Sequence, residues 1–333
     1  MELKELHASH LEEAATLLSA RHARERLTYP VLPDSFEDPQ QALTVLQALQ
    51  QKENAIGVGA FRGNKLVGYM LGAIDTDKNR ERHVWIDYAG SAISGEESPE
   101  RYRDLYAWLG EKWVNHGAFD HYVVVPGGDS MALDAWFRLG FGHQQVHAIQ
   151  HIPEPLATTP NVTDFHIRRA TKEDEAVVRS FATLIMEHQA KAPVWAPGFP
   201  EERRKLQDGY AGLLEDEEVW VWLASSKEGA PLGFQAYWPT SENMMTPGMS
   251  ISLGVGATLP EARGKGVASA LTRHGLSSAL QSGYTRCVTD WRMTNLQSSR
   301  FWPDHGFIPI AYRLARNIDR RMAWATGRRH PHE

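Results

Sequence analysis

The sequence has a single cysteine, no excess of positive charge and no long apolar run. Cys287 alone excludes an intramolecular disulfide and a cysteine-based zinc cluster. The formal net charge of −6 gives no general attraction to nucleic acid or to an anionic membrane. The charged N-terminal segment lacks the apolar core of a signal peptide, and no segment could span a bilayer. We therefore expect a soluble cytoplasmic protein with no metal ion, no nucleic-acid partner and no membrane partner.

The two halves of the chain repeat one plan. Each half opens on a short strand followed by a helix, continues through a strand with a glycine step, and closes on a Gly-Phe corner. Three pairs of landmarks lie at nearly one spacing: 166 residues for Gly140 and Gly306, 166 for Trp136 and Trp302, and 165 for Gly68 and Gly233. Several landmarks in the same order indicate duplication of one α/β unit.

This repeat predicts two tandem domains, which suits a chain of 333 residues. The seam should lie in the segment 151–164, which is rich in Pro and Thr and poor in large apolar residues. We expect a first domain over 1–150, a linker over 151–164 and a second domain over 165–333. The order of strands and helices in each half is that of an α/β (α+β) domain.

A glycine-rich turn in the second half is the most specific chemical feature. The stretch "PEARGKGVASAL" (260–271) follows an expected strand over 250–258 that has mostly small side chains. It opens a helix that we expect to run from Val267 to a stop at Gly283. Gly264 and Gly266 allow the backbone to approach a ligand closely, and the helix start favours negative charge. Neighbouring cationic side chains add to this preference, so the turn predicts a phosphate or pyrophosphate site. The spacing is not that of a Walker motif, and the turn comes too late in its half for a dinucleotide fold.

Two motifs in the second half resemble a known family. The run from Arg263 to Ala268 matches the Arg/Gln-x-x-Gly-x-Gly/Ala signature of the GNAT superfamily of acyl-CoA N-acyltransferases. The run "NLQSSRFWPDHGF" (295–307) resembles that family's Asn-x-x-Ala/Ser helix, which ends in Gly-Phe. The resemblance implies tandem GNAT-like domains, each with a mixed, splayed β-sheet flanked by helices. It also implies an N-acetyltransferase that moves an acetyl group from acetyl-CoA to a primary amine by direct attack in a ternary complex.

The resemblance assigns acetyl-CoA, as co-substrate, to the second half. The pantetheine should lie along the strand edge near 254–258, and the pyrophosphate should lie on the turn. The implied coenzyme-binding residues are Gly256, Ala257, Thr258, Arg263, Gly264, Lys265, Gly266, Val267, Ala268, Asn295, Ser298 and Trp302. The implied catalytic residues are Asn295 and Ser298. The acceptor is expected to be a small-molecule or peptide amine, and the protein is expected to be a monomer or homodimer.

One residue departs from the family pattern. Trp302 stands where the family usually has a tyrosine that protonates the leaving thiolate, and an indole N–H is no useful acid. Ser298, Ser299, Tyr312 or a water near Asn295 are the possible substitutes. The departure also supports an alternative function, that of a non-catalytic acyl-CoA-binding sensor or scaffold.

Two of the implied site residues have a second interpretation. Asn295 is a functional amide, a helix cap or both, and Trp302 is a wall of the thioester channel or a core residue.

Other side chains also have more than one interpretation. Asp290 is either the base that deprotonates the amine or part of a surface ion pair. His188 and Glu187 lie on the first helix of the second half, where most such residues face solvent. Trp195 and Phe199, in a proline-rich stretch, either line an acceptor pocket or pack in the core.

The first half lacks the phosphate cradle. At an offset of 166 residues, Arg263 to Gly266 correspond to Glu97, Ser98, Pro99 and Glu100. Two acids would repel a pyrophosphate, and the proline has no amide to offer. We therefore expect 1–150 to be a degenerate, non-catalytic GNAT-like domain.

Overall fold

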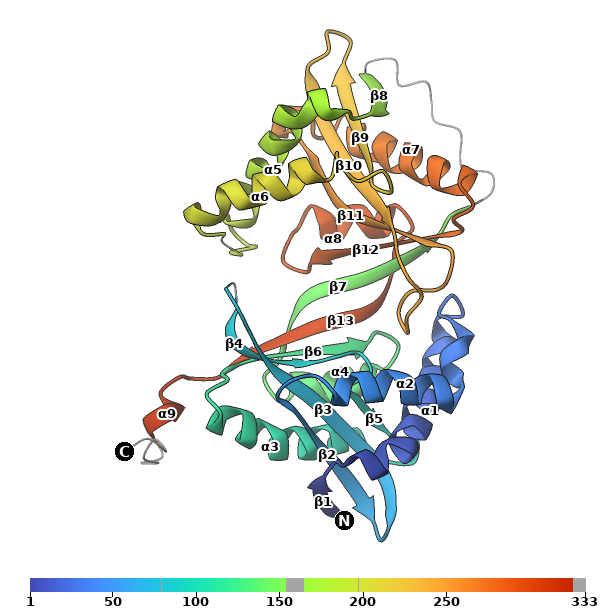
Figure 1. Cartoon of the computed structure of the whole chain (residues 1–333), viewed down its shortest axis with the longest axis vertical. Helices are drawn as coiled ribbons and strands as arrows, with labels where there is room; N and C mark the ends of the chain where they lie inside the picture. The colour runs from blue at the N-terminus through green and yellow to red at the C-terminus, as the bar shows by residue number, and fades with distance from the viewer. Residues whose placement is uncertain (79, 154–164, 197, 326–333) are drawn as a thin grey trace. The chain divides into compact units, whose positions relative to one another are not determined.

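The computed structural model describes residues 1–78, 80–153, 165–196 and 198–325. It divides the chain into two compact units, which Figure 1 colours along the chain. The first unit consists of Met1–Val146 and Ile310–Glu333, and the second consists of His147–Pro309. Each unit is a mixed sheet flanked by helices, which confirms the predicted fold class. In the described part of the chain, no helix has both the length and the apolar character needed to cross a membrane.

The first unit contains a sheet in the order β1-β2-β3-β4-β6-β13, with β5 paired to β3. Its strands are β1 (Glu2–Glu5), β2 (Ala55–Arg62), β3 (Lys65–Asp77), β4 (Glu81–Ile86), β5 (Ser91–Ile93), β6 (Asp120–Pro126) and β13 (Ile308–Asn317). Its helices are α1 (Leu11–Thr28), α2 (Pro39–Gln50), α3 (Glu100–Asn115), α4 (Ser130–Phe137) and α9 (Met322–Ala325), with short 3₁₀ turns at Ala8–His10 and Asp34–Glu37. Only the pairing of β4 with β6 is parallel among these described strands.

The second unit contains a sheet in the order β8-β9-β10-β11-β12-β7. Its strands are β7 (Gly142–His151, which begins in the first unit), β8 (Phe165–Arg169), β9 (Trp220–Ser226), β10 (Pro231–Pro239), β11 (Ser250–Thr258) and β12 (Arg286–Arg292). Its helices are α5 (Glu175–Gln189), α6 (Arg203–Gly212), α7 (Val267–Gln281) and α8 (Ser298–Asp304), with 3₁₀ turns at Lys172–Asp174, Pro200–Glu202 and Pro260–Ala262. The pairings β8–β9, β9–β10 and β10–β11 are antiparallel, whereas the pairing β11–β12 is parallel.

Helices α5 and α7 cover opposite faces of the second sheet. On β9, Val221 and Leu223 belong to the apolar cluster under α5, whereas Trp222 and Ala224 belong to the cluster under α7. Successive strand residues point to opposite faces, so this alternation separates the two helices. Figure 1 shows α5 and α7 on the two sides of β9 and β10.

Strands β11 and β12 part after a short paired segment. Their backbone register runs only from Ser250 opposite Arg286 to Ser252 opposite Val288. At the next step the Thr289 hydroxyl donates a hydrogen bond of 2.8 Å to the Leu253 carbonyl, so a side chain replaces a backbone partner. The remainder of β11 stays paired with β10 on its other edge. The sheet of the second unit is therefore splayed between β11 and β12.

The last strand of each half is exchanged between the units, which the sequence repeat does not predict. β13 pairs antiparallel with β6, from Ala311 opposite Pro126 to Asn317 opposite Asp120. Residues from 310 onward therefore belong to the first unit, rather than to the predicted domain 165–333. The reason is that the repeat spacing is a property of the sequence alone and does not specify which sheet a terminal strand joins. Most of the predicted linker, 154–164, lies outside the described residues.

Candidate active site

The turn before α7 has the backbone that its glycines predict. Gly264 and Gly266 have φ angles of 73° and 81°, in the left-handed region that other residues rarely adopt. A β-carbon at either position would meet no atom within 4 Å, so the constraint is the backbone angle and not space. The turn is exposed from Arg263 to Gly266, and Val267 is the first buried residue of α7. An external ligand therefore has access to the backbone of this turn.

The turn presents unpaired amides beside positive charge. Among the described residues, no acceptor is found for the backbone amides of Gly264, Lys265 and Gly266. The first amides of α7 have no partner within the helix because of its geometry. The Arg263 Nε atom donates to the Thr258 carbonyl at 3.3 Å, which holds the guanidinium beside the end of β11. This arrangement is suited to an anion such as a pyrophosphate.

The predicted strand edge leads directly to this turn. Gly256, Ala257 and Thr258 pair with β10 through one edge of β11. Within the described residues, no strand pairs with their other edge, because β12 has already diverged. A β-carbon on Gly256 would lie 2.9 Å from Gln235 Cγ, so the strand is bare at this position because it packs closely against its neighbour. The free edge offers backbone donors and acceptors to an extended ligand.

Asn295 caps α8 and also contacts α5. Its Oδ1 atom accepts hydrogen bonds from the backbone amides of Gln297 at 3.2 Å and Ser298 at 3.3 Å. The same oxygen lies 3.3 Å from Nε2 of His188. The interpretation of Asn295 as a helix cap is confirmed. The expectation that His188 faces solvent is wrong, because the His188 side chain is half-buried against this oxygen. Ser298 is half-buried at the first position of α8.

Trp302 packs in the apolar interior of the second unit. Its side chain is 9% exposed, and its ring contacts those of Phe301 and Phe307 edge-on at centroid distances of 4.8 and 5.4 Å. Core packing of this residue is confirmed. Whether the ring also borders the coenzyme stays a prediction.

A serine–histidine contact beside the turn has no signal in the sequence. His305 lies 2.7 Å from the Phe301 carbonyl through Nδ1 and 2.8 Å from the Ser269 hydroxyl through Nε2. A carbonyl only accepts, so Nδ1 carries the proton and Nε2 accepts from Ser269. The bond ties α8 to the first turn of α7. The two residues are 36 positions apart, and only the packing of the two helices brings them together.

Most of the remaining candidates lie on exposed surface. Asp290 is exposed and already has a polar partner, which supports its surface reading. Glu187 is exposed and lies 3.6 Å from Arg203. Trp195 and Phe199 are 71% and 56% exposed in the segment after α5, so they do not pack in the core. Tyr312 lies on β13 in the first unit.

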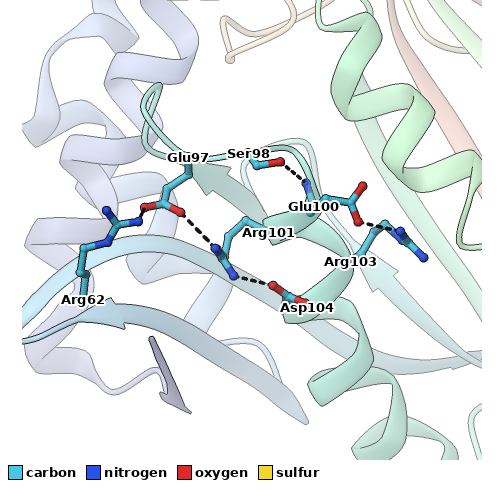
Figure 2. Close-up of polar contacts among 7 residues, drawn as sticks. All are labelled: Arg62, Glu97, Ser98, Glu100, Arg101, Arg103 and Asp104. Atoms are coloured by element: carbon cyan, nitrogen blue, oxygen red, sulfur yellow. Dashed lines mark hydrogen bonds and ion pairs between the residues drawn. The ribbon is translucent and has the colours of Figure 1, made fainter.

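The first unit fills the equivalent loop with its own charges, as Figure 2 shows. The Glu97 carboxylate is 4% exposed and accepts hydrogen bonds from Arg62 at 2.6 Å and from Arg101 at 3.2 Å. Ser98 accepts a hydrogen bond of 3.3 Å from the Glu100 amide at the start of α3. The Glu97 carboxylate thus pairs with the two arginine side chains, Arg62 and Arg101, that a bound pyrophosphate would need.

The described residues offer no metal site. Among them, no group of three His, Cys, Asp or Glu side chains could hold a metal ion.

Part of the second half matches a known family. Residues 183–307 match the model of the acetyltransferase (GNAT) family. This part of the chain is therefore a GNAT-family domain, which confirms the resemblance that its two motifs carry.

Solved structures share the fold of nearly the whole chain. A GCN5-related N-acetyltransferase from Sphaerobacter thermophilus superposes with a TM-score of 0.59 at 14% identity, over 95% of each chain. A tandem GNAT protein from the clavulanic acid biosynthesis pathway gives 0.51 at 14% identity, over 95% of this chain and 98% of that one.

A third structure contains a GCN5-related glucosamine N-acetyltransferase region within a fungal multi-domain GH3 β-N-acetylglucosaminidase. It gives a TM-score of 0.54 at 14% identity, over 94% of this chain and 38% of that one. At these identities the similarity shows the fold alone, which is that of tandem GNAT proteins. No match was found among curated proteins.

Proposed function

We propose that this protein transfers an acetyl group from acetyl-CoA to a primary amine, by direct attack in a ternary complex, and that only its second unit binds the coenzyme. The observation that carries the proposal is the turn Arg263–Ala268. It combines unpaired amides, two glycines with positive φ and two cationic side chains at the start of a helix. These features stabilise an anion through several short hydrogen bonds and through the helix dipole.

The neighbouring backbone supports the rest of the coenzyme. Pantetheine has two amide groups in an extended chain, and the free edge of β11 offers matching donors and acceptors from Gly256 to Thr258. A ligand that follows this edge from the turn reaches the place where β11 and β12 part. In this proposal an amine attacks the thioester at that point from the opposite side of the sheet.

A second candidate function is coenzyme binding without turnover. Trp302 at the usual tyrosine position favours it, because the indole supplies no transferable proton. Release of free CoA in the presence of an amine separates the two candidates. A transferase consumes acetyl-CoA only when an acceptor is present, whereas a sensor binds it and leaves it intact.

Calorimetric titration with acetyl-CoA tests the binding site. We expect one site per chain, and we expect Gly266→Glu to weaken binding at least tenfold, or about 1.4 kcal/mol. The new carboxylate would repel the pyrophosphate, and the residue would resist a φ of 81°.

Gly63→Glu is the matched control for this titration. Gly63 has a φ of 61° in an exposed turn of the first unit, with no atom within 4 Å of its added β-carbon. This variant suffers similar backbone strain and gains the same charge, yet it should bind acetyl-CoA as the wild type does. Two equal sites per chain, or unchanged affinity in a folded Gly266→Glu protein, would contradict the proposed site.

A further inference from the structure

The apolar stripe of α5 ends in a histidine. Val178, Phe181, Leu184 and Ile185 recur at helical spacing and pack against the cluster over β9 to β11. The next position of this stripe is His188, four residues after Leu184 and three after Ile185. A polar, half-buried side chain at this position needs a partner, and it finds one in Asn295.

The contact with Asn295 determines which ring nitrogen of His188 carries the proton. The Asn295 atom that faces the ring also accepts two backbone N–H groups, at 3.2 and 3.3 Å. Backbone amides only donate, so this atom is the side-chain oxygen, and it has no hydrogen to offer. Nε2 of His188 must therefore donate across the 3.3 Å contact. Nδ1 is left with its lone pair and can accept a proton.

The position of His188 suits an approach to the splayed strands. α5 contacts β11, and Val255 and Ala257 of β11 pack against the same cluster as Leu184 and Ile185. α5 lies on the sheet face opposite to α7 and its turn. His188 contacts Asn295, which follows the end of β12 by three residues, so an acceptor bound at the gap on the α5 side would lie on the same sheet face as His188.

Of the two strands that border this gap, β12 carries one carboxylate, Asp290, which is exposed and already has a polar partner, and β11 carries no base. β11 reads "SISLGVGAT" and carries no carboxylate, histidine or lysine from Ser250 to Thr258. The neighbouring carboxylate on α5, Glu187, points to exposed surface and lies 3.6 Å from Arg203.

We propose that His188 is the general base of the transferase reaction, with Asn295 as the residue that positions its ring. The assignment rests on the proposed function. Nδ1 of His188 takes one proton from the acceptor amine as the amine nitrogen forms a bond to the thioester carbonyl carbon. The C–S bond then breaks, and the thiolate leaves with the electron pair and takes a proton from solvent. His188 returns its proton to solvent, so no oxidant or further reactant is needed.

The ring tautomer can be measured without any acceptor. Nitrogen NMR of the full chain labelled with ¹⁵N-histidine, above the pH at which the ring is protonated, distinguishes Nε2–H from Nδ1–H. The His188 signals are assigned by their absence in His188→Gln. We expect the Nε2–H form. A clear Nδ1–H form would overturn the proposal, because the nitrogen directed away from Asn295 would then carry the proton.

Turnover of acetyl-CoA tests the chemical role. The wild type is assayed for CoA release with tyramine, putrescine, glucosamine and a lysine peptide. His188→Gln should lower kcat by ~10²–10⁴-fold with an unchanged KM for acetyl-CoA, since a general base contributes about this much. Free imidazole should restore part of the rate in His188→Ala, which a purely structural defect would not allow.

Glu187→Gln is the matched control on the same helix turn and should retain the wild-type rate. Full activity of His188→Gln would overturn the assignment of the base and leave the transferase intact. Absence of CoA release by the wild type with every amine of the panel, despite coenzyme binding, would instead remove the transferase proposal and the base with it.

Discussion

At the scale of the residue, Trp302 has the clearest conflict with the expected chemistry. It occupies the position where the family usually has a tyrosine, yet its side chain is buried and packs between Phe301 and Phe307. An indole has no proton to transfer near neutral pH. Any contribution to catalysis is therefore steric or that of a fixed N–H donor.

Substitution of Trp302 tests this reading. Trp302→Phe retains most of the ring and should lower kcat by less than tenfold, well below the ~10²–10⁴-fold loss that follows removal of a general acid. Trp302→Tyr should have a similar or higher rate, since it restores a phenol. Steady-state rates with the best amine of the panel, together with melting curves for both variants, provide the measurement. A thousandfold loss in folded Trp302→Phe with normal coenzyme binding would mean that the indole N–H is essential.

At the scale of the element, a buried histidine joins β6 to α3 in the first unit. His121 lies 3.1 Å from the Ala118 carbonyl through Nε2 and 2.7 Å from the Tyr106 hydroxyl through Nδ1. The carbonyl requires Nε2–H, so Nδ1 accepts the proton of Tyr106. Desolvation by burial lowers the pKa of His121 from 6.5 to about 4, because the charged ring would lose its hydration. The neutral ring is thus part of the packing of α3 on the sheet.

This shift predicts that acid weakens the first unit. Between about pH 6.5 and about pH 4 the unfolded chain binds a proton at His121 and the folded chain does not, so the free energy of unfolding falls as the pH falls. The neutral His121 ring contributes about 3 kcal/mol to the free energy of unfolding, from the size of its pKa shift. This contribution is fully present above about pH 6.5 and is lost as the pH falls to about 4. His121→Asn, which does not titrate, should show a shallower loss of melting temperature over this window.

The control for this measurement is His116→Asn. His116 is exposed and bonds only locally, to the Lys112 carbonyl. Its substitution should leave the pH dependence of the melting temperature as in the wild type. Equal slopes for wild type and His121→Asn would show that His121 does not remain neutral in the folded state.

At the scale of the whole molecule, the exchanged strand makes the first unit depend on the end of the chain. β13 covers the edge of β6, and its Ile310, Ala311 and Leu314 are at most 2% exposed. A fragment that ends at residue 153 would leave this edge unpaired and would remove a buried leucine. An exposed hydrophobic edge favours aggregation, and loss of one such leucine alone costs about 2–5 kcal/mol.

We therefore expect residues 1–153 alone to lack a cooperative thermal transition. The same fragment with residues 308–325 attached through a flexible linker should regain one, and a variant of that fusion with Leu314→Asp should not. Circular dichroism melts of the three proteins provide the comparison. Cooperative unfolding of the short fragment near the temperature of the full chain would show that β13 is dispensable.

Much of the second unit could be predicted from its sequence, because the signals are local. The bare run "SISLGVGAT" is β11 over Ser250–Thr258, and the helix expected from Val267 is α7. The positive φ angles at Gly264 and Gly266 follow from residue type. The capping role of Asn295 also follows from its place ahead of a helix.

Three features were decided only by tertiary structure. His188 meets Asn295 across 107 positions, and Ser269 meets His305 across 36, because helix packing brings their side chains together.

The exchange of β13 into the first unit depends on which sheet edge is free when the chain folds, and no local pattern records that choice. By itself, the sequence predicted the strand β11, the turn before α7 and the resemblance of the second half to the GNAT family. Only the tertiary structure decided which distant side chains pair and which unit contains β13. Both depend on contacts between segments far apart in the sequence.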